Sequence, residues 1–243
     1  MNTSGEPNDR RAALTLAVVV PTLNEEAMLP ALLASLHAQT HPAERIVVAD
    51  GGSHDRTASE ARLGGAEVVV APGRGRGGQI AAGAAELSED VVLVAHADMR
   101  FPPLALETVR KSLAQFPRCP GGSLGHRFDD SSPSLRLIEW WDRRRARRGA
   151  SYGDQAQFYR RNLLDSLGGF PNQPIMEDVE LSLRLRRLGT PIYLDLPVTV
   201  SARRFVRKKW WRIVWQNFLM RRSYRRHGLP VCAQLHERYY RDS

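Results

Sequence analysis

The sequence predicts an α/β fold whose core is a mainly parallel sheet. Short apolar runs alternate with segments of helical spacing through the first half of the chain, a pattern typical of strand–helix–strand units with right-handed crossovers. The chain has 243 residues, which is enough to bury the core of one domain and to carry an appendage.

Four strands and three helices are expected before residue 100. Turn-forming residues such as Pro21 and the stretch Asp50-Gly51-Gly52 follow the apolar runs. Asn24 is expected to cap the first helix, and residues 72–79 form an expected glycine-rich loop. The expected strands cover residues 14–20, 45–49, 66–71 and 91–98, and the expected helices cover 24–39, 54–65 and 79–87.

The second part of the chain departs from strict alternation. A helix over 132–149 is expected to bury Leu135, Ile138 and Trp141, with the basic run Arg143 to Arg148 on a solvated face. The other expected elements are helices over 102–116 and 177–189, a strand with turns over 119–130, a strand and short helix over 155–170, and a last strand over 190–204.

Positive charge is concentrated at the carboxyl end. The net charge of the chain is +9, and residues 201–243 hold 12 Lys and Arg against two Asp and Glu. We expect a disordered tail over 1–13, an α/β domain over 14–201 and a basic, aromatic helical segment over 202–243. Such a local excess of positive charge attracts phosphate groups.

The C-terminal segment interleaves aromatic residues with Arg and Lys. Trp210, Trp211, Trp215 and Phe218 could form the apolar side of a helix at a membrane surface. The same segment could instead cap the sheet or form a homodimer contact. No nucleic-acid partner is expected, because no recognition motif accompanies the charge.

Cysteine usage and hydropathy bound the compartment. Cys119 and Cys232 are far apart and have no metal-ligating neighbours in sequence, so neither a disulfide framework nor a zinc site is expected. No stretch approaches the roughly 18 consecutive apolar residues of a membrane span. We therefore expect a cytoplasmic protein, either soluble or peripheral at the inner face of the membrane.

Three acidic sites indicate a crevice at one edge of the expected sheet. Asp50 and Asp98 each close an apolar run that has the character of a buried strand, and open α/β sheets bind ligands at the carboxyl ends of their strands. Glu177 and Asp178 open a helical segment, which places both in its first turn. This order favours nucleotide and sugar chemistry.

A glycine fingerprint supports a rival interpretation. Gly73, Gly75 and Gly78 match G-x-G-x-x-G between a strand and a helix, with Asp98 about twenty residues further on, which is the spacing of a dinucleotide-binding loop. The protein would then be an NAD(P)-binding oxidoreductase. Two arginines inside the loop count against this interpretation, which also leaves the other acidic sites without a role.

Six motifs, taken in order, resemble the large family 2 of nucleotide-sugar glycosyltransferases with the GT-A fold. The resemblance extends from about Val18 to about Ser201. It is closest to a bacterial subgroup of small, soluble members with HAD in the metal-binding position. The motifs are PTLNEE, ADGGSHDRT, GRGRGGQ, HAD, YGDQ and GGFPNQPIMEDVELSLRLRRLG.

The resemblance implies a mixed, Rossmann-like GT-A sheet flanked by helices and an inverting, metal-dependent sugar transfer. The donor would be UDP- or GDP-linked, and the acceptor would be a hydroxyl that could be lipid-linked. A divalent cation, Mn²⁺ or Mg²⁺, would be held by Asp98. His96 replaces the first acid of the family's D-x-D motif and is a second candidate ligand, so a non-catalytic nucleotide-sugar-binding protein stays open as an alternative.

The same resemblance assigns roles to the other motif residues. Asp178 would be the general base that takes the proton of the acceptor hydroxyl. Gly153, Asp154, Gln155 and Glu177 would contact the acceptor or the sugar. The residues bordering the donor nucleotide would be Pro21, Thr22, Glu25, Asp50, Gly51, Arg76, Ala97 and Asp98.

Overall fold

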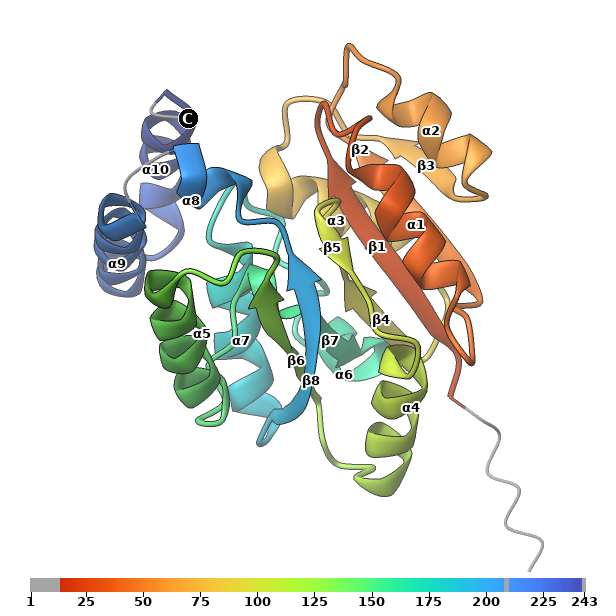
Figure 1. The fold of residues 1–243 in the computed structure, drawn as a ribbon. Coiled ribbons are helices and arrows are strands. Elements are labelled where there is room, and N and C mark those ends of the chain that lie inside the picture. Colours follow the sequence, from red (N-terminus) through yellow and green to blue (C-terminus); the bar gives the residue numbers. More distant parts are fainter. Residues whose placement is uncertain (1–13, 208–209, 242–243) are drawn as a thin grey trace, which may run out of the picture.

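The computed structural model describes residues 14–207 and 210–241 and is built on an eight-stranded sheet (Figure 1). The expected tail over 1–13 lies outside the described residues. The strands stand in the order β3-β2-β1-β4-β7-β6-β8-β5. Their bounds are β1 Leu16–Thr22, β2 Arg45–Asp50, β3 Glu67–Val70, β4 Val91–Val94, β5 Met99–Arg100, β6 Gly121–Phe128, β7 Gln157–Arg160 and β8 Ile192–Val200.

One half of the sheet is parallel, as predicted. β1 pairs in parallel with β2 and β4, and β2 pairs in parallel with β3, so the carboxyl ends of these strands meet at one edge. β7 runs antiparallel to both β4 and β6. β8 is parallel to β6, with a bulge between Leu124 and Gly125, and β5 is antiparallel to β8. The predicted mixed sheet is confirmed.

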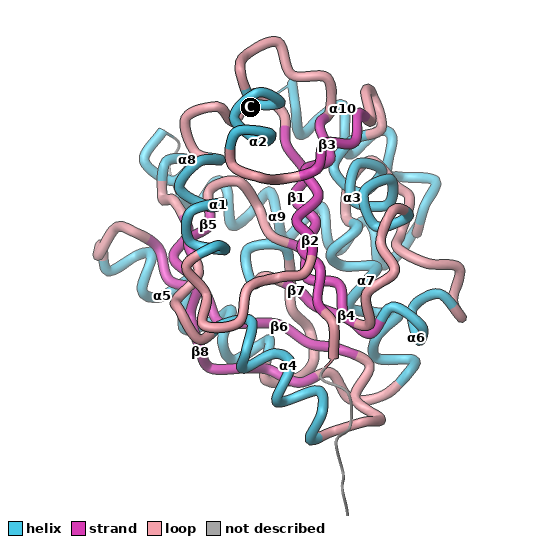
Figure 2. The backbone as a smooth tube through the Cα atoms, turned by 90° about the vertical axis from the view of Figure 1, so that its right-hand side faces the viewer, coloured by secondary structure: helices cyan, strands magenta, loops and turns pink. Residues whose placement is uncertain are grey.

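Helices cover both faces of this sheet (Figure 2). They are α1 Leu29–His37, α2 Thr57–Leu63, α3 Gly75–Ala85, α4 Ala105–Gln115, α5 Pro133–Ala146, α6 Arg161–Asp165, α7 Glu177–Leu188, α8 Arg203–Arg207, α9 Trp210–His227 and α10 Cys232–Arg241, with short 3₁₀ helices η1 Gly153–Gln155 and η2 Leu229–Val231. Leu16, Val18 and Val20 of β1 join a core cluster with α1, α2 and α4. Ala17 and Val19 join α3, α6 and α7 on the opposite face.

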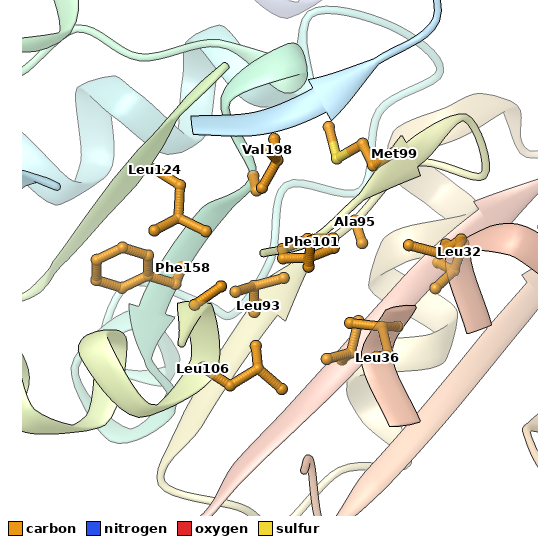
Figure 3. Close-up of a cluster of buried hydrophobic side chains, with 14 of the residues drawn as sticks. Leu32, Leu36, Leu93, Ala95, Met99, Phe101, Leu106, Leu124, Phe158 and Val198 are labelled. Atoms are coloured by element: carbon orange, nitrogen blue, oxygen red, sulfur yellow. The ribbon is translucent and has the colours of Figure 1, made fainter. Parts of the chain in front are cut away.

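The larger core cluster lies against the middle of the sheet. Figure 3 shows Leu36 of α1, Leu106 of α4, Leu93 of β4 and Phe158 of β7 gathered in this cluster. All four side chains are fully buried, and burying a side chain of this size contributes about 1.5–3 kcal/mol. The cluster therefore fixes the strands whose ends carry the acidic sites.

A smaller apolar cluster attaches the C-terminal helices to the start of α7. Met220 and Tyr224 of α9 and Cys232 of α10 are buried together with Val179 of α7. The Tyr224 hydroxyl also donates a hydrogen bond to Glu180 at 2.7 Å. Figure 1 shows α9 and α10 at the side of the molecule away from α1 and α2. No helix in the described residues has the length and apolar character that crossing a membrane requires.

Three expected details were wrong. α1 begins at Leu29, and Asn24 adopts φ 55° and accepts a hydrogen bond from the His54 N–H at 3.0 Å, so it organises a loop instead of capping the helix. α3 begins at Gly75, so most of the expected glycine-rich loop is helical. Trp141 is 58% exposed because its side of α5 lines a cavity and not the core.

Cys232 reports whether the C-terminal helices dock in solution. Its side chain is buried, and burial raises the pKa of the thiol to about 11. We expect iodoacetamide at about pH 8 to modify Cys232 at least ~100-fold more slowly in the native protein than in urea, because the thiolate is the reactive form. Mass spectrometry of the Cys232 peptide gives both rates.

Two variants separate docking from simple surface effects. Met220→Asp should accelerate the modification because Met220 lies inside the apolar cluster. Leu219→Asp is the matched control, because Leu219 is 41% exposed on the same helix. Fast modification of the wild-type thiol would contradict the docking of α9 and α10.

Candidate active site

The first acidic site, Asp50, shapes the turn at the end of β2. It lies beside Thr22, and Pro21 and Thr22 are the last residues of β1, next to it in the sheet. The buried carboxylate accepts hydrogen bonds from the backbone N–H groups of Gly52 (3.2 Å) and Ser53 (3.0 Å) and from the Ser53 hydroxyl (2.5 Å). Because a carboxylate has about four acceptor sites, Asp50 can still accept a further hydrogen bond from a ligand.

The second acidic site, Asp98, lies in the turn after β4. That strand ends at Val94, so the expected strand over 91–98 is too long, and the HAD residues, with Ala97 buried among them, form the turn. Burial and the charge of Asp154 together raise the pKa of Asp98 to about 6, although Arg203 acts in the opposite direction. A bound cation would stabilise this carboxylate in its charged form.

His96 belongs to the same turn, and its ring lies beside Gly153 of η1. Its Nε2 atom is buried and has no hydrogen-bond partner among the described residues. Burial lowers the pKa of the imidazole to about 4, and the charge of Arg76 acts in the same direction, so the ring is neutral at neutral pH. A Cβ atom on Gly153 would lie 3.0 Å from Nε2, so glycine at this position leaves room for the ring.

These donors fit a divalent cation only if a ligand completes its coordination shell. Within residues 14–207 and 210–241, no three His, Cys, Asp or Glu side chains converge on one point. Asp98 offers a carboxylate in a surplus of negative charge, and His96 offers an unpaired ring nitrogen. Mn²⁺ accepts both ligand types. Oxygen atoms of a bound diphosphate would have to supply the other positions.

The third acidic site is held between α3 and η1. Glu177 is 1% exposed and forms an ion pair with Arg76. Burial raises the pKa of Glu177, and Arg76 acts against this. Asp178 accepts hydrogen bonds from the Gly153 N–H at 2.8 Å and the Val179 N–H at 2.7 Å, and its Oδ2 lies 3.9 Å from Nη2 of Arg76. Both carboxylates are therefore fixed by the protein.

The backbone that precedes these carboxylates is strained. Met176 adopts φ 66°, in the left-handed region that residues other than glycine seldom occupy. Such a conformation costs about 1–3 kcal/mol and persists where the surrounding structure imposes it. Met176 is buried in the cluster beneath α9 and α10, so the C-terminal helices help to hold the start of α7 in place.

Gly75 of the G-x-G-x-x-G fingerprint and the neighbouring Gly77 pack closely against the segment before α7. A Cβ atom on Gly75 would lie 2.5 Å from the carbonyl oxygen of Pro174, and one on Gly77 would lie 2.7 Å from Cβ of Glu177 and overlap the carbonyl of Gln173. These glycines let α3 approach the segment before α7 closely enough for Arg76 to reach Glu177. The packing thus gives Gly75 a structural role that requires no dinucleotide.

The three residues of η1, which were predicted to contact the acceptor or the sugar, have different surroundings. The backbone N–H of Gly153 donates to Asp178. Gln155 is buried, and its Oε1 atom accepts hydrogen bonds from the Tyr152 N–H at 3.2 Å and from Arg145 at 3.4 Å, so it positions the segment. Asp154 is exposed, and its charge acts on both the Asp98 and the His96 side chains.

A cavity of about 890 Å³ opens beside Asp178. Asp154 and Arg76 line it together with Asp178, and α5 and α9 form its far wall. The sequence analysis missed this wall, to which α5 and α9 contribute arginines and aromatic residues. The basic runs RRRARR and RRSYRR are visible in the sequence, but nothing in their spacing shows that they face each other.

The C-terminal segment also reaches the loop that follows β1. Arg203, at the start of α8, donates a hydrogen bond to Glu25 at 2.5 Å. The other oxygen of Glu25 is buried without a partner among the described residues. Arg203 thus holds the largely buried Glu25 carboxylate, whose charge also acts on Asp98.

Comparison with known proteins decides the family. The model of the family described as glycosyl transferase family 2 matches residues 17–163. The chain belongs to glycosyl transferase family 2. With the packing of its glycines, this membership leaves no support for the oxidoreductase alternative.

Curated relatives of this family 2 chain include proteins of two kinds. An uncharacterized glycosyltransferase of Mycobacterium tuberculosis is 42% identical over 83 residues, which are 34% of this chain and 36% of that protein. The undecaprenyl-phosphate 4-deoxy-4-formamido-L-arabinose transferase of Serratia proteamaculans is 28% identical over 165 residues, 63% of this chain and 51% of that protein. The chain thus spans about a third to a half of these relatives.

Solved structures share the fold. The mannosyltransferase PcManGT from Pyrobaculum calidifontis, in complex with GDP-Man and Mn²⁺, superimposes with a TM-score of 0.63 at 22% identity, over 79% of this chain and 58% of that one. Glucosyl-3-phosphoglycerate synthase from Mycobacterium tuberculosis, in complex with phosphoglyceric acid, gives 0.59 at 24% identity, over 78% and 71%. The GT-A fold that the sequence predicts is confirmed.

Replacing Gly77 tests the close approach of α3 to α7. A Cβ atom there would overlap backbone that cannot move without displacing Glu177, so we expect Gly77→Ala to lower the unfolding free energy by roughly 1–3 kcal/mol, as overpacking does. Urea unfolding measures this change. Gly83→Ala is the control, because its Cβ would lie 3.1 Å from a side-chain methyl group and should cost less. Equal stability of Gly77→Ala and wild type would contradict the packing described.

Proposed function

We propose that this chain transfers a sugar, with inversion, from a UDP- or GDP-linked donor to an acceptor hydroxyl. The observation that carries the proposal is the Asp178 carboxylate, which is hydrogen-bonded by two backbone N–H groups at the wall of the large cavity. The acceptor oxygen bonds to the anomeric carbon while the bond from that carbon to the diphosphate breaks. The acceptor proton passes to Asp178, and the nucleoside diphosphate leaves.

The donor nucleotide is proposed to lie at the carboxyl ends of β1, β2 and β4. Asp50, Thr22 and Asp98 follow one another along this edge, where open α/β sheets bind nucleotides. Membership of family 2 supports this position, as does the fold shared with proteins solved with GDP-Man or UDP. Glu25 and Gly51 would border the base and ribose.

Asp98 and His96 would hold a divalent cation at the diphosphate. Such a cation would neutralise the charge that develops on the departing diphosphate. The raised pKa of Asp98 supports the role, because a bound cation would offset both the burial and the nearby negative charges that raise it. Two structures of the same fold contain Mn²⁺.

Arg76 and Glu177 position the proposed base. Arg76 lies between the two carboxylates of α7, and its ion pair with Glu177 holds its side chain near Asp178. The sequence analysis placed Arg76 at the donor nucleotide. In this structure Arg76 also lines the cavity, so its guanidinium is within the site where donor and acceptor would meet.

The exposed aromatic face of α9 is relevant to where the protein lies in the cell. Trp211, Trp215 and Phe218 are 50%, 59% and 46% exposed, and Trp215 stacks on Phe218 with ring centroids 5.5 Å apart. Exposed aromatic residues among arginines are typical of helices at a membrane interface. Membrane contact, dimerisation through this face and a cytoplasmic location stay predictions.

Replacing Asp178 tests the assignment of the base. Asp178→Asn keeps an oxygen that can accept the Gly153 N–H but cannot take a proton, so we expect transfer to fall by about 10²–10⁴-fold. Nucleotide binding should stay unchanged. Turnover of the nucleotide sugar and calorimetric binding of UDP or GDP measure the two properties.

Asp165→Asn is the matched control, since Asp165 is exposed on α6 and is not among the residues that line the cavity. Undiminished transfer by Asp178→Asn would exclude Asp178 as the base. A transferred sugar that keeps its anomeric configuration, as read by NMR, would contradict direct displacement. Nucleotide-sugar binding with no turnover by the wild type under any metal condition would favour the non-catalytic alternative.

A further inference from the structure

We propose that Arg145 and Arg221, gathered around Tyr152 in the large cavity, form a subsite for a phosphate group carried by the acceptor. The proposal rests on the function proposed above in one respect, namely that the molecule bound in this cavity is the acceptor. It adds a chemical class to that acceptor, a phosphomonoester or phospholipid that also bears the reacting hydroxyl.

The geometry brings cations from two helices to one aromatic ring. The guanidinium carbon of Arg145, on α5, lies 4.1 Å from the centroid of the Tyr152 ring, and that of Arg221, on α9, lies 5.1 Å from it. Arg225 donates a hydrogen bond to the Tyr152 hydroxyl at 3.0 Å. Guanidinium groups provide the paired donors that suit phosphate oxygens.

The charges of these arginines are incompletely balanced. Arg145 forms an ion pair with Asp142. Arg221 is half-buried, and no ion pair connects it to an acidic residue in the part of the chain that the structure describes. Burial lowers the pKa of Arg221, and the like charge of Arg145 adds to this effect. An anion bound beside both guanidinium groups would relieve their repulsion and their desolvation.

The subsite is connected directly to the proposed base. Tyr152 precedes Gly153, whose N–H donates to Asp178, and the cavity is lined by Arg145, Tyr152, Asp178 and Arg221 together. A phosphate held at Tyr152 would thus orient the rest of its molecule along the cavity toward Asp178. Orientation of this kind is how remote binding energy assists a reaction.

The cavity also accepts an apolar portion of the same molecule. Trp215 and Phe218 of α9 and Trp141 of α5 line it and are partly exposed. Both a soluble phosphomonoester and a phospholipid would present a phosphate to Arg145 and Arg221. The difference between these two sources lies in whether the aromatic residues contact a lipid chain.

Calorimetric titration with inorganic phosphate tests the subsite. The titration is made on the full chain, both free and with UDP or GDP and Mn²⁺ at saturation, so that the donor site cannot take the phosphate. We expect Arg221→Gln and Arg145→Gln each to weaken phosphate binding by about 10-fold or more, the loss typical of a charge-assisted hydrogen bond. Arg212→Gln, which replaces an exposed arginine of α9 outside the cavity lining, should bind phosphate as the wild type does.

Equal phosphate affinity of wild type and both cavity variants would overturn the proposal. Nucleotide binding in the same samples separates the two claims, because its absence would count against the donor site and not against the phosphate subsite. Arg221→Gln should unfold at the same temperature as wild type or higher, because it removes like-charge repulsion. If Arg221→Gln does not fold, Arg145→Gln and the conservative Arg221→Lys carry the test.

Two further ligands distinguish the sources of phosphate. Glycerol 3-phosphate represents a soluble phosphomonoester, and phosphatidylcholine vesicles containing phosphatidic acid represent a lipid, with pure phosphatidylcholine vesicles as the blank. Loss of glycerol 3-phosphate binding in Arg221→Gln assigns a soluble acceptor. Loss of binding confined to the phosphatidic acid vesicles assigns a lipid acceptor. Undiminished binding to both would overturn the proposal.

Discussion

The ion pair between Arg76 and Glu177 is the contact on which the rest of the site depends. It joins α3, which packs on the parallel half of the sheet, to α7, which carries the proposed base. Glu177 is almost completely buried, and removing one partner of a buried pair typically costs about 3–5 kcal/mol because the other charge is left uncompensated. The pair can form only because Gly75 and Gly77 let α3 approach the start of α7 closely.

Several other contacts hold the start of α7 together with this ion pair. Met176 keeps a left-handed backbone, Gly153 donates to Asp178, and the C-terminal helices cover the apolar side of this corner. A carboxylate fixed before substrate arrives needs no reorganisation during the reaction. The C-terminal helices serve both this corner and the cavity, since α9 forms one wall of the cavity.

Much of the fold could be predicted from the sequence, and the reasons are local. Asp50 and Asp98 follow apolar runs, so their place near strand ends follows from the alternation of strands and helices. The exact ends of these elements were less predictable. Asn24 was expected to cap a helix, but its side chain accepts a hydrogen bond from the His54 N–H and joins the loops after β1 and β2. The family resemblance supplied the mixed sheet, which alternation alone would have made parallel.

The cavity wall could not be predicted, because it depends on contacts distant in sequence. Arg145 and Arg221 belong to separate basic runs, and each run is typical of a solvated helix face. Only the docking of α9 through Met220 and Tyr224 brings both arginines to Tyr152. The left-handed conformation of Met176 is likewise imposed by tertiary packing, since methionine itself has no preference for it.

Calorimetric binding of UDP and GDP, each with and without Mn²⁺, to the wild type and to Asp98→Ala tests the central claim most directly. The account predicts that one of the two nucleotides binds the wild type only with Mn²⁺, and that Asp98→Ala loses this binding while keeping its fold by circular dichroism. Equal binding by the variant, or binding of NAD in place of UDP and GDP, would contradict a cation-assisted nucleotide-sugar site at the strand ends.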